Sequence, residues 1–390
     1  MDSLRGKVAI VGAAETEVGK VPHLGATALC VDAARRVMED AGITKEQVDG
    51  LVTCNSMTEP YMYHAEAIAE YLQIFPRYCV SANAGGGTTF STIQHAATAI
   101  ANGVCETILV TMADCLRTGL SREQAMKMQS STGHPEFEIP YGPTVPAFYA
   151  LIARAHMDAY GTSPEQFAAV AVSGRKHAAL NPNAQMRELI SVEDVLSSPL
   201  IADPLHLLDC SLVSDGGAAI ILTSSERAKD FPHPPVFILG AGEGHSHEHI
   251  SQASSLTTSA AVESGRRAYK MAGLGPDDMD IAQIYDCFTP VVLIELEDLG
   301  FCKKGEAGAF VQAGETGLAG SLPMNTNGGL LSHCHPGNPG SMFALTEAVT
   351  QLRHQAGARQ VEHAETALVH GQGGIMSSHA TLILGRERGG

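Results

Sequence analysis

Three features that would place this 390-residue chain in a special class are missing from it. Its nine cysteines include no Cys-x-x-Cys pair, which argues against a disulfide framework or a zinc ribbon and favours reduced thiols. No apolar run is long enough to cross a membrane. Basic residues form no cluster, and a net charge of -17 would repel nucleic acid. We therefore expect a soluble, cytoplasmic protein that binds neither membranes nor nucleic acid and holds no metal.

What is present describes a folded α/β protein. A hydrophobic content of 44% with 17% charged residues is typical of a globular chain, and the length predicts two domains or two fused halves. Strand and helix signals alternate, which favours buried sheets covered by helices. The patterns predict strands at 8–11, 49–54, 78–80, 107–110, 218–222, 236–239, 281–285 and 366–369, and helices at 26–41, 90–101, 148–160, 167–178 and 291–299.

The periodicity is lost from about 114 to 146, where Gly, Pro, Ser, Thr and Met dominate. We interpret this stretch as the irregular start of a loop excursion that covers about 114–190. Long irregular segments in compact domains are usually functional or mobile. The excursion either covers a substrate or forms a surface flap or an oligomer contact.

The second half of the sequence repeats the order of the first. The Ala-Gly-Ile turn at 41–43, followed by a strand and Cys54, has a counterpart in the Ala-Gly-Leu turn at 272–274, followed by a strand and Cys287. The later glycine turns and strands also correspond. We therefore predict a duplicated α/β unit with halves at 1–225 and 226–390.

Polar and glycine-rich segments follow several of the predicted strands. They are the turn at 83–87, the Tyr-Asp-Cys-Phe motif at 285–288, the Gly-rich turn at 325–337 and the His-Gly-Gln-Gly-Gly segment at 370–374. Ligands of open α/β sheets bind at the carboxyl ends of strands, where such segments converge. Two histidines in the third segment, His333 and His335, can exchange protons near neutral pH. The sequence therefore predicts one site built from all four segments.

These motifs, in this order, resemble those of the thiolase superfamily over almost the whole chain, and most closely those of its sterol-carrier-protein-x and lipid-transfer-protein branch. The resemblance implies a five-layered α-β-α-β-α fold, a homodimer and acyl-coenzyme A substrates in lipid metabolism. It also implies that coenzyme A is part of the substrate and that no cofactor is covalently bound. A small partner protein with a zinc ribbon and an OB fold, in a hetero-oligomer, is a further implication.

The sequence departs from the thiolase pattern at the residues that carry covalent chemistry. Ala84 stands where thiolases of this kind place their nucleophilic cysteine, and alanine cannot form an acyl-enzyme. The terminal acid/base cysteine falls on Gly371, or on His370 if the register slips by one. The histidine of the Gly-His-Pro motif is kept as His335, with Cys334 in place of the glycine. The resemblance therefore favours the branch members that cleave carbon-carbon bonds by a retro-aldol route.

We assign roles on that basis. Retro-aldol cleavage needs a base for a β-hydroxyl, stabilisation of a thioester enolate, and an acid that protonates the enolate. Tyr285 is the predicted acid, His335 or His333 the base, and the backbone N–H groups near Ala84 and Gly373 the enolate-binding groups. Secondary candidates are Cys334, Cys287, His370 and Asn83.

Two other functions stay open at this point. The first is a β-ketoacyl-CoA thiolase or acyltransferase that uses Cys334 or Cys287 instead of the missing cysteine. The second is a non-catalytic subunit that binds acyl-CoA or scaffolds a partner. A structural role is also open for Tyr285, because a tyrosine at a strand end is commonly a core aromatic whose hydroxyl is hydrogen-bonded.

Overall fold

The apolar runs of the sequence form the strands of a large mixed sheet. The structure, a computed structural model, describes residues 4–389. Within this range one nine-stranded sheet has the order β3-β2-β4-β7-β1-β8-β11-β10-β9, and β5 and β6 form a small separate sheet. The strands are β1 Val8–Glu15, β2 Gly50–Cys54, β3 Tyr78–Ala82, β4 Thr107–Cys115, β5 Leu200–Ala202, β6 Leu205–His206, β7 Asp215–Ser224, β8 Val236–His245, β9 Ile281–Ile284, β10 Thr366–Gly373 and β11 Ser378–Gly385. The strand predictions are confirmed in position, and β1, β4, β8 and β10 run further than predicted.

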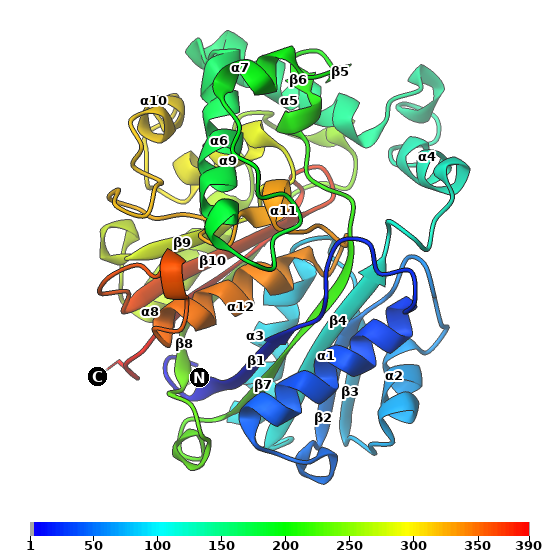
Figure 1. Cartoon of the computed structure of the whole chain (residues 1–390), viewed down its shortest axis with the longest axis vertical. Helices are drawn as coiled ribbons and strands as arrows, with labels where there is room; N and C mark the ends of the chain where they lie inside the picture. Colours follow the sequence, from blue (N-terminus) through cyan, green and yellow to red (C-terminus); the bar gives the residue numbers. More distant parts are fainter. Residues whose placement is uncertain (1–3, 390) are drawn as a thin grey trace.

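Helices cover both faces of the sheet (Figure 1). The helices are α1 Ala26–Ala41, α2 His64–Leu72, α3 Thr88–Ala101, α4 Arg122–Ser130, α5 Val145–Tyr160, α6 Pro164–Leu180, α7 Val192–Ser197, α8 Ala261–Ala272, α9 Thr289–Asp298, α10 Ala307–Gln312, α11 Gly329–Ser332 and α12 Gly340–Leu352.

The sheet repeats one strand order in its two parts. The order β3-β2-β4-β7-β1 in the first part corresponds to β9-β10-β11-β8 in the second. In both, a parallel pair is followed by two antiparallel pairs. The counterpart of β3 is reduced to a parallel bridge between Ala282 and Met324. The two parts are joined where Ala9 and Ile10 of β1 pair with Phe237 and Val236 of β8.

The helices form three layers around the two parts of the sheet (Figure 1). Helix α1 packs on β1, β4 and β7, and α8 packs on β8 and β11, so both lie on the outside. Helices α3 and α12 contact each other and strands of both parts, which places them in the middle. This arrangement gives the five layers that the resemblance implies.

The stretch predicted to be irregular contains a helix. Residues 122–130 form α4, whose start is capped because Ser121 Oγ accepts a hydrogen bond from the Gln124 N–H at 3.1 Å. No residue of α4 is buried, and Figure 1 shows it projecting from the body of the protein. The irregular prediction was therefore wrong here, because a helix without a buried face lacks the apolar period that reveals helices. No helix within residues 4–389 is long and apolar enough to span a bilayer.

A buried carboxylate fixes the start of this excursion to the sheet. Asp215, at the first position of β7, is fully buried. Its side chain accepts hydrogen bonds from the backbone N–H groups of Val21 at 2.9 Å, Arg117 at 2.9 Å and Thr118 at 3.0 Å. These bonds hold the segment after β4 in place, and buried N–H groups without such a partner are costly.

We expect the Asp215→Ala variant to lose about 2 kcal/mol or more of unfolding free energy, because it leaves the buried N–H group of Val21 and the part-buried N–H groups of Arg117 and Thr118 unpaired. The measurement is urea denaturation followed by circular dichroism. Asp230→Ala is the matched control, since Asp230 is exposed and its loss should change stability by less than about 0.5 kcal/mol. Equal midpoints for the two variants would contradict the role given to Asp215.

Candidate active site

The centre of the site is a hydrogen bond between Tyr285 and His335. Tyr285 follows the end of β9, and its hydroxyl lies 3.0 Å from Nε2 of His335, which belongs to the loop between α11 and α12. The two rings meet edge to face at a centroid distance of 5.8 Å. Tyr285 is 7% exposed, and His335 is partly exposed. The pair is therefore buried but reachable from the side of His335.

Two serines hold His335 in place, and the sequence did not reveal either. Ser211 Oγ lies 2.8 Å from His335 Nδ1, and Ser214 Oγ accepts a hydrogen bond from the His335 backbone N–H at 3.0 Å. The Ser214 N–H in turn donates to the His335 carbonyl at 3.1 Å. When Nδ1–H donates to Ser211, the free lone pair is on Nε2 and faces Tyr285. Both serines lie in an irregular segment before β7, where no motif marks them.

The neighbouring acid anchors the Gly-rich turn. Asp286 is buried and accepts hydrogen bonds from the N–H groups of Leu330 at 2.7 Å and Leu331 at 3.3 Å. Burial raises the pKa of Asp286 to about 6. Gly329 has φ of +63°, and a Cβ there would collide with the Asp286 carboxyl group. This glycine therefore lets the turn approach the end of β9, which brings His335 to Tyr285.

The glycine turn at 83–87, which we call the second glycine turn, forms the other wall of the site. The Tyr285 ring packs against Gly86, where a Cβ would overlap the ring atoms. Gly373 lies against the Ala84 carbonyl in the same way. The structure thus brings Ala84 and Gly373 together beside Tyr285. In this structure the Ala84 N–H donates to Thr88 Oγ1 at 2.7 Å, so a thioester oxygen would compete with this hydroxyl.

Burial sets the protonation states of the central pair. It raises the pKa of Tyr285 well above its usual range, with the nearby Cys287, Asp286 and Glu295 adding to the effect. It lowers the pKa of His335 to about 4. At neutral pH the tyrosine is therefore a phenol and the imidazole is uncharged. A neutral donor and a neutral acceptor face each other, as proton transfer in both directions requires.

Among the described residues, no basic side chain lowers the pKa of either candidate cysteine. Cys287 is buried, and its sulfur accepts a hydrogen bond from Gln372 Nε2 at 3.1 Å. Cys334 is also buried, within the apolar core. Burial raises the pKa of both thiols, and nearby carboxylates raise it further. Reactive cysteines need the opposite surroundings, because the thiolate is the nucleophile.

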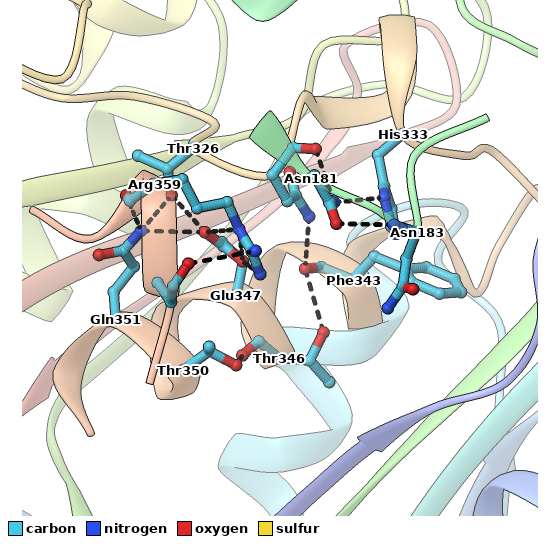
Figure 2. A network of polar contacts seen from close by, with 12 residues as sticks. Asn181, Asn183, Thr326, His333, Phe343, Thr346, Glu347, Thr350, Gln351 and Arg359 are labelled. Atoms are coloured by element: carbon cyan, nitrogen blue, oxygen red, sulfur yellow. Dashed lines mark hydrogen bonds and ion pairs between the residues drawn. The ribbon is translucent and has the colours of Figure 1, made fainter. Parts of the chain in front are cut away.

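His333 has its partners in a different network (Figure 2). Its Nδ1 lies 2.9 Å from Asn181 Nδ2, and its Nε2 lies 3.4 Å from a carboxylate oxygen of Glu15. The Asn181 side chain also donates to the Asn327 carbonyl at 3.0 Å. Further along, α12 contributes Glu347, which is paired with Arg359 at 2.9 Å. His333 thus connects α6, β1 and the Gly-rich turn, and its hydrogen bonds do not join the Tyr285–His335 pair.

The remaining secondary candidates lie at the two extremes of burial. Asn83 is exposed at the rim, where its Oδ1 accepts a hydrogen bond from Asn338 Nδ2 at 3.0 Å. His370 is fully buried on β10 and bonded to Thr381 and His379 rather than to Tyr285 or His335. Gly371, the next residue, lies beside the Gly86 carbonyl. The residue of β10 that faces the second glycine turn is therefore Gly371.

Comparisons with known proteins identify the family of the chain. The chain matches the thiolase N-terminal domain model over residues 8–226 and the thiolase C-terminal domain-like model over residues 242–386. It is 37% identical to the 17-hydroxy-3-oxo-4-pregnene-20-carboxyl-CoA lyase of Mycobacterium tuberculosis, over 98% of this chain and all of that protein. It is 32% identical to an acetyl-CoA acetyltransferase of Methanothermobacter thermautotrophicus, over 97% of this chain and 99% of that one.

A solved structure, that of an Ltp2-ChsH2(DUF35) aldolase, superposes on the chain with a TM-score of 0.88. The two sequences are 35% identical, and the alignment covers 98% of each chain. Both family models and the fold thus lead to the same conclusion: the chain belongs to the thiolase superfamily.

Proposed function

We propose that this protein cleaves a carbon-carbon bond in a β-hydroxyacyl-CoA thioester by a retro-aldol reaction. The observation that carries the proposal is the Tyr285–His335 hydrogen bond beside a turn in which Ala84 leaves no nucleophile. The relative named 17-hydroxy-3-oxo-4-pregnene-20-carboxyl-CoA lyase supports the substrate class. In such a compound the hydroxyl carbon is β to the thioester carbonyl.

The reaction needs only proton movements that the pair can supply. The substrate hydroxyl approaches the Tyr285 oxygen and passes it a proton while the phenolic proton moves to His335 Nε2. The Cα–Cβ bond breaks, the hydroxyl carbon becomes a carbonyl, and the bonding electrons form the thioester enolate. Tyr285 then donates to Cα and regains its proton from His335. One hydroxyl proton ends on carbon, so no oxidant, reductant or covalent intermediate is required.

The enolate oxygen needs hydrogen-bond donors, because charge develops there as the bond breaks. We assign this role to the backbone at Ala84 and Gly373, which the fold brings into contact. The Thr88 hydroxyl that now accepts from Ala84 N–H would turn toward the Gly85 carbonyl, to which it already donates at 2.6 Å. His333 has no part in this assignment, because its Nδ1 is bonded to Asn181 and its Nε2 lies 3.4 Å from the Glu15 carboxylate rather than beside Tyr285.

The halves 1–225 and 226–390 remain our proposed domain division, and we propose a cytoplasmic homodimer that joins a small second protein. Strand β3 is an edge of the sheet, and the segment that precedes it in sequence exposes apolar side chains, among them Met62 at 89%, Tyr63 at 68% and Phe75 at 97%. Such an edge favours association. The Ltp2-ChsH2(DUF35) name joins two components, which supports a hetero-oligomer here.

Product analysis with paired thioesters tests the reaction class. Purified protein, alone and with its partner, is given β-hydroxyacyl-CoA, or β-ketoacyl-CoA together with free coenzyme A. We expect a ketone or aldehyde and a shortened acyl-CoA from the hydroxy compound, and no thiolysis of the keto compound. Thiolysis with an acylated Cys287 or Cys334 would favour the acyltransferase alternative. The similarity to the acetyl-CoA acetyltransferase of Methanothermobacter thermautotrophicus supports that alternative. Binding of acyl-CoA without turnover would favour a non-catalytic subunit.

Replacing the central phenol should remove most of the activity. We expect Tyr285→Phe to lower kcat/KM for a β-hydroxyacyl-CoA by at least about 100-fold, because general acid–base groups contribute about this much. Tyr269→Phe is the matched control, since the Tyr269 hydroxyl bonds the Leu299 carbonyl at 3.1 Å on the outer helix α8. Steady-state kinetics give the comparison, and a Tyr285→Phe enzyme with the rate of the control would remove Tyr285 from the mechanism.

The low pKa of His335 predicts an unusual pH profile. Burial lowers this pKa to about 4, so the basic, neutral imidazole persists as the pH falls from 8 to 5.5. Asp286, which anchors the same turn, has a pKa of about 6, so the profile is measured in the Asp286→Asn variant, where kcat/KM should stay flat over that range and fall only as the pH approaches 4. Assays of samples returned to pH 7.5 separate titration from denaturation. A reversible decline of the Asp286→Asn variant centred near pH 6.5 would show that His335 titrates as an ordinary histidine.

A further inference from the structure

A second group of titratable side chains lies on the outer face of the C-terminal strands. Glu295 of α9, His370 of β10 and His379 of β11 are each fully buried. His370 Nε2 lies 3.1 Å from His379 Nδ1 and 3.5 Å from Glu295 Oε1. His379 Nδ1 lies 3.9 Å from the same carboxylate oxygen. Three ligand atoms from three elements therefore surround one point.

Among residues 4–389, no group neutralises the carboxyl group of Glu295 through a hydrogen bond or a basic side chain. Neither of its oxygens has a hydrogen-bond partner. The charged groups that act on its pKa are the acids Asp298 and Asp286, which raise it beyond the effect of burial. A buried carboxylate without hydrogen bonds is costly, and a proton or a cation must neutralise it. Two neutral imidazoles beside the carboxylate favour the cation, because their nitrogen lone pairs can bind it together with the carboxylate oxygen.

The spacing of the three atoms fits a small divalent cation. Zinc binds imidazole nitrogen and carboxylate oxygen at about 2.0–2.2 Å in a tetrahedral arrangement, which separates neighbouring ligand atoms by about 3.3 Å. The three separations of 3.1, 3.5 and 3.9 Å bracket this value. Two histidines and one glutamate are also a donor set that zinc uses with a water molecule as the fourth ligand.

Outer contacts orient the first histidine. His370 Nδ1 lies 2.8 Å from Thr381 Oγ1, and Ser264 Oγ lies 2.9 Å from the same threonine oxygen. A hydrogen bond at Nδ1 directs Nε2 toward Glu295 and fixes its lone pair there. Metal-binding histidines are held in this way, by a hydrogen bond to the ring nitrogen that does not touch the metal.

We propose that Glu295, His370 and His379 form a binding site for a divalent cation of the zinc class. The cation neutralises the Glu295 carboxylate and ties α9 to the β10–β11 pair. Both elements also support the candidate active site, because α9 follows the 285–288 motif and β10 ends at Gly373. The site stabilises the fold and takes no part in the carbon-carbon bond cleavage. The sequence analysis expected no metal, because the ligands lie 75 and 9 residues apart and match no known metal-binding motif.

Metal analysis of untagged protein tests the proposal. We expect about one equivalent of zinc per chain by plasma mass spectrometry when the protein is expressed with zinc. Because the ligands are fully buried, exchange is tested by unfolding in urea and refolding with EDTA or with zinc. We expect the zinc sample to have a Tm several degrees higher, since a ligand of the folded state stabilises it. Refolding with cobalt should give the visible spectrum of a tetrahedral Co²⁺ site.

Variants assign the ligands. Glu295→Gln keeps the side-chain shape without the charge, and His379→Gln removes one imidazole, so both should lose the bound zinc and the zinc-dependent Tm rise. His245→Gln is the matched control, because His245 lies on the neighbouring β8 and is 56% exposed, with partners in Ser378 and Glu243. This variant should keep the zinc. A metal-free wild-type protein whose Tm is the same after both refoldings would overturn the proposal, even if the variants do not fold.

Discussion

The short contact between Tyr285 and His335 depends on places where the chain has no side chain. The ring of Tyr285 fits beside Gly86, and the turn that carries His335 reaches β9 because Gly329 has no Cβ to strike Asp286. Asp286 then holds that turn through two backbone N–H groups. Backbone packing at these glycines therefore sets the distance between two catalytic candidates that are 50 residues apart in sequence.

The same packing explains how the thiolase scaffold can work without its nucleophile. A covalent mechanism needs a thiolate, and burial raises the pKa of Cys287 and Cys334. Burial has the opposite value for a proton relay, because it keeps Tyr285 protonated and His335 neutral. The burial that keeps the cysteines protonated thus also leaves a neutral phenol and a neutral imidazole, as the proposed proton transfer in both directions requires.

The sequence predicts this site only in part. The rule that ligands bind at the carboxyl ends of strands, together with the family resemblance, predicts Tyr285, His335 and the two glycine turns as parts of the site. Each of them follows a strand or precedes a helix. Ser211 could not be found in this way, since it lies in an irregular segment 124 residues from its partner His335. The choice between His333 and His335 also required coordinates. Outside a regular element, no period tells which of two histidines two residues apart faces the site. Likewise, α4 has no buried face and therefore left no apolar period to read.

Alternation along β10 separates the two polar clusters. Successive side chains of a strand point to opposite faces, so neighbours on β10 belong to different environments. Gly371 lies beside Gly86, on the side of the central helices, whereas His370 meets Thr381 and Glu295 on the side of α9. A side chain at position 371 would collide with the second glycine turn. A polar side chain at position 370 is fully buried and therefore needs hydrogen-bond partners. The pair Glu295 and His379 supplies those partners. One strand therefore keeps the side of the candidate active site free of bulk, while its other face carries His370 toward the buried carboxyl group of Glu295.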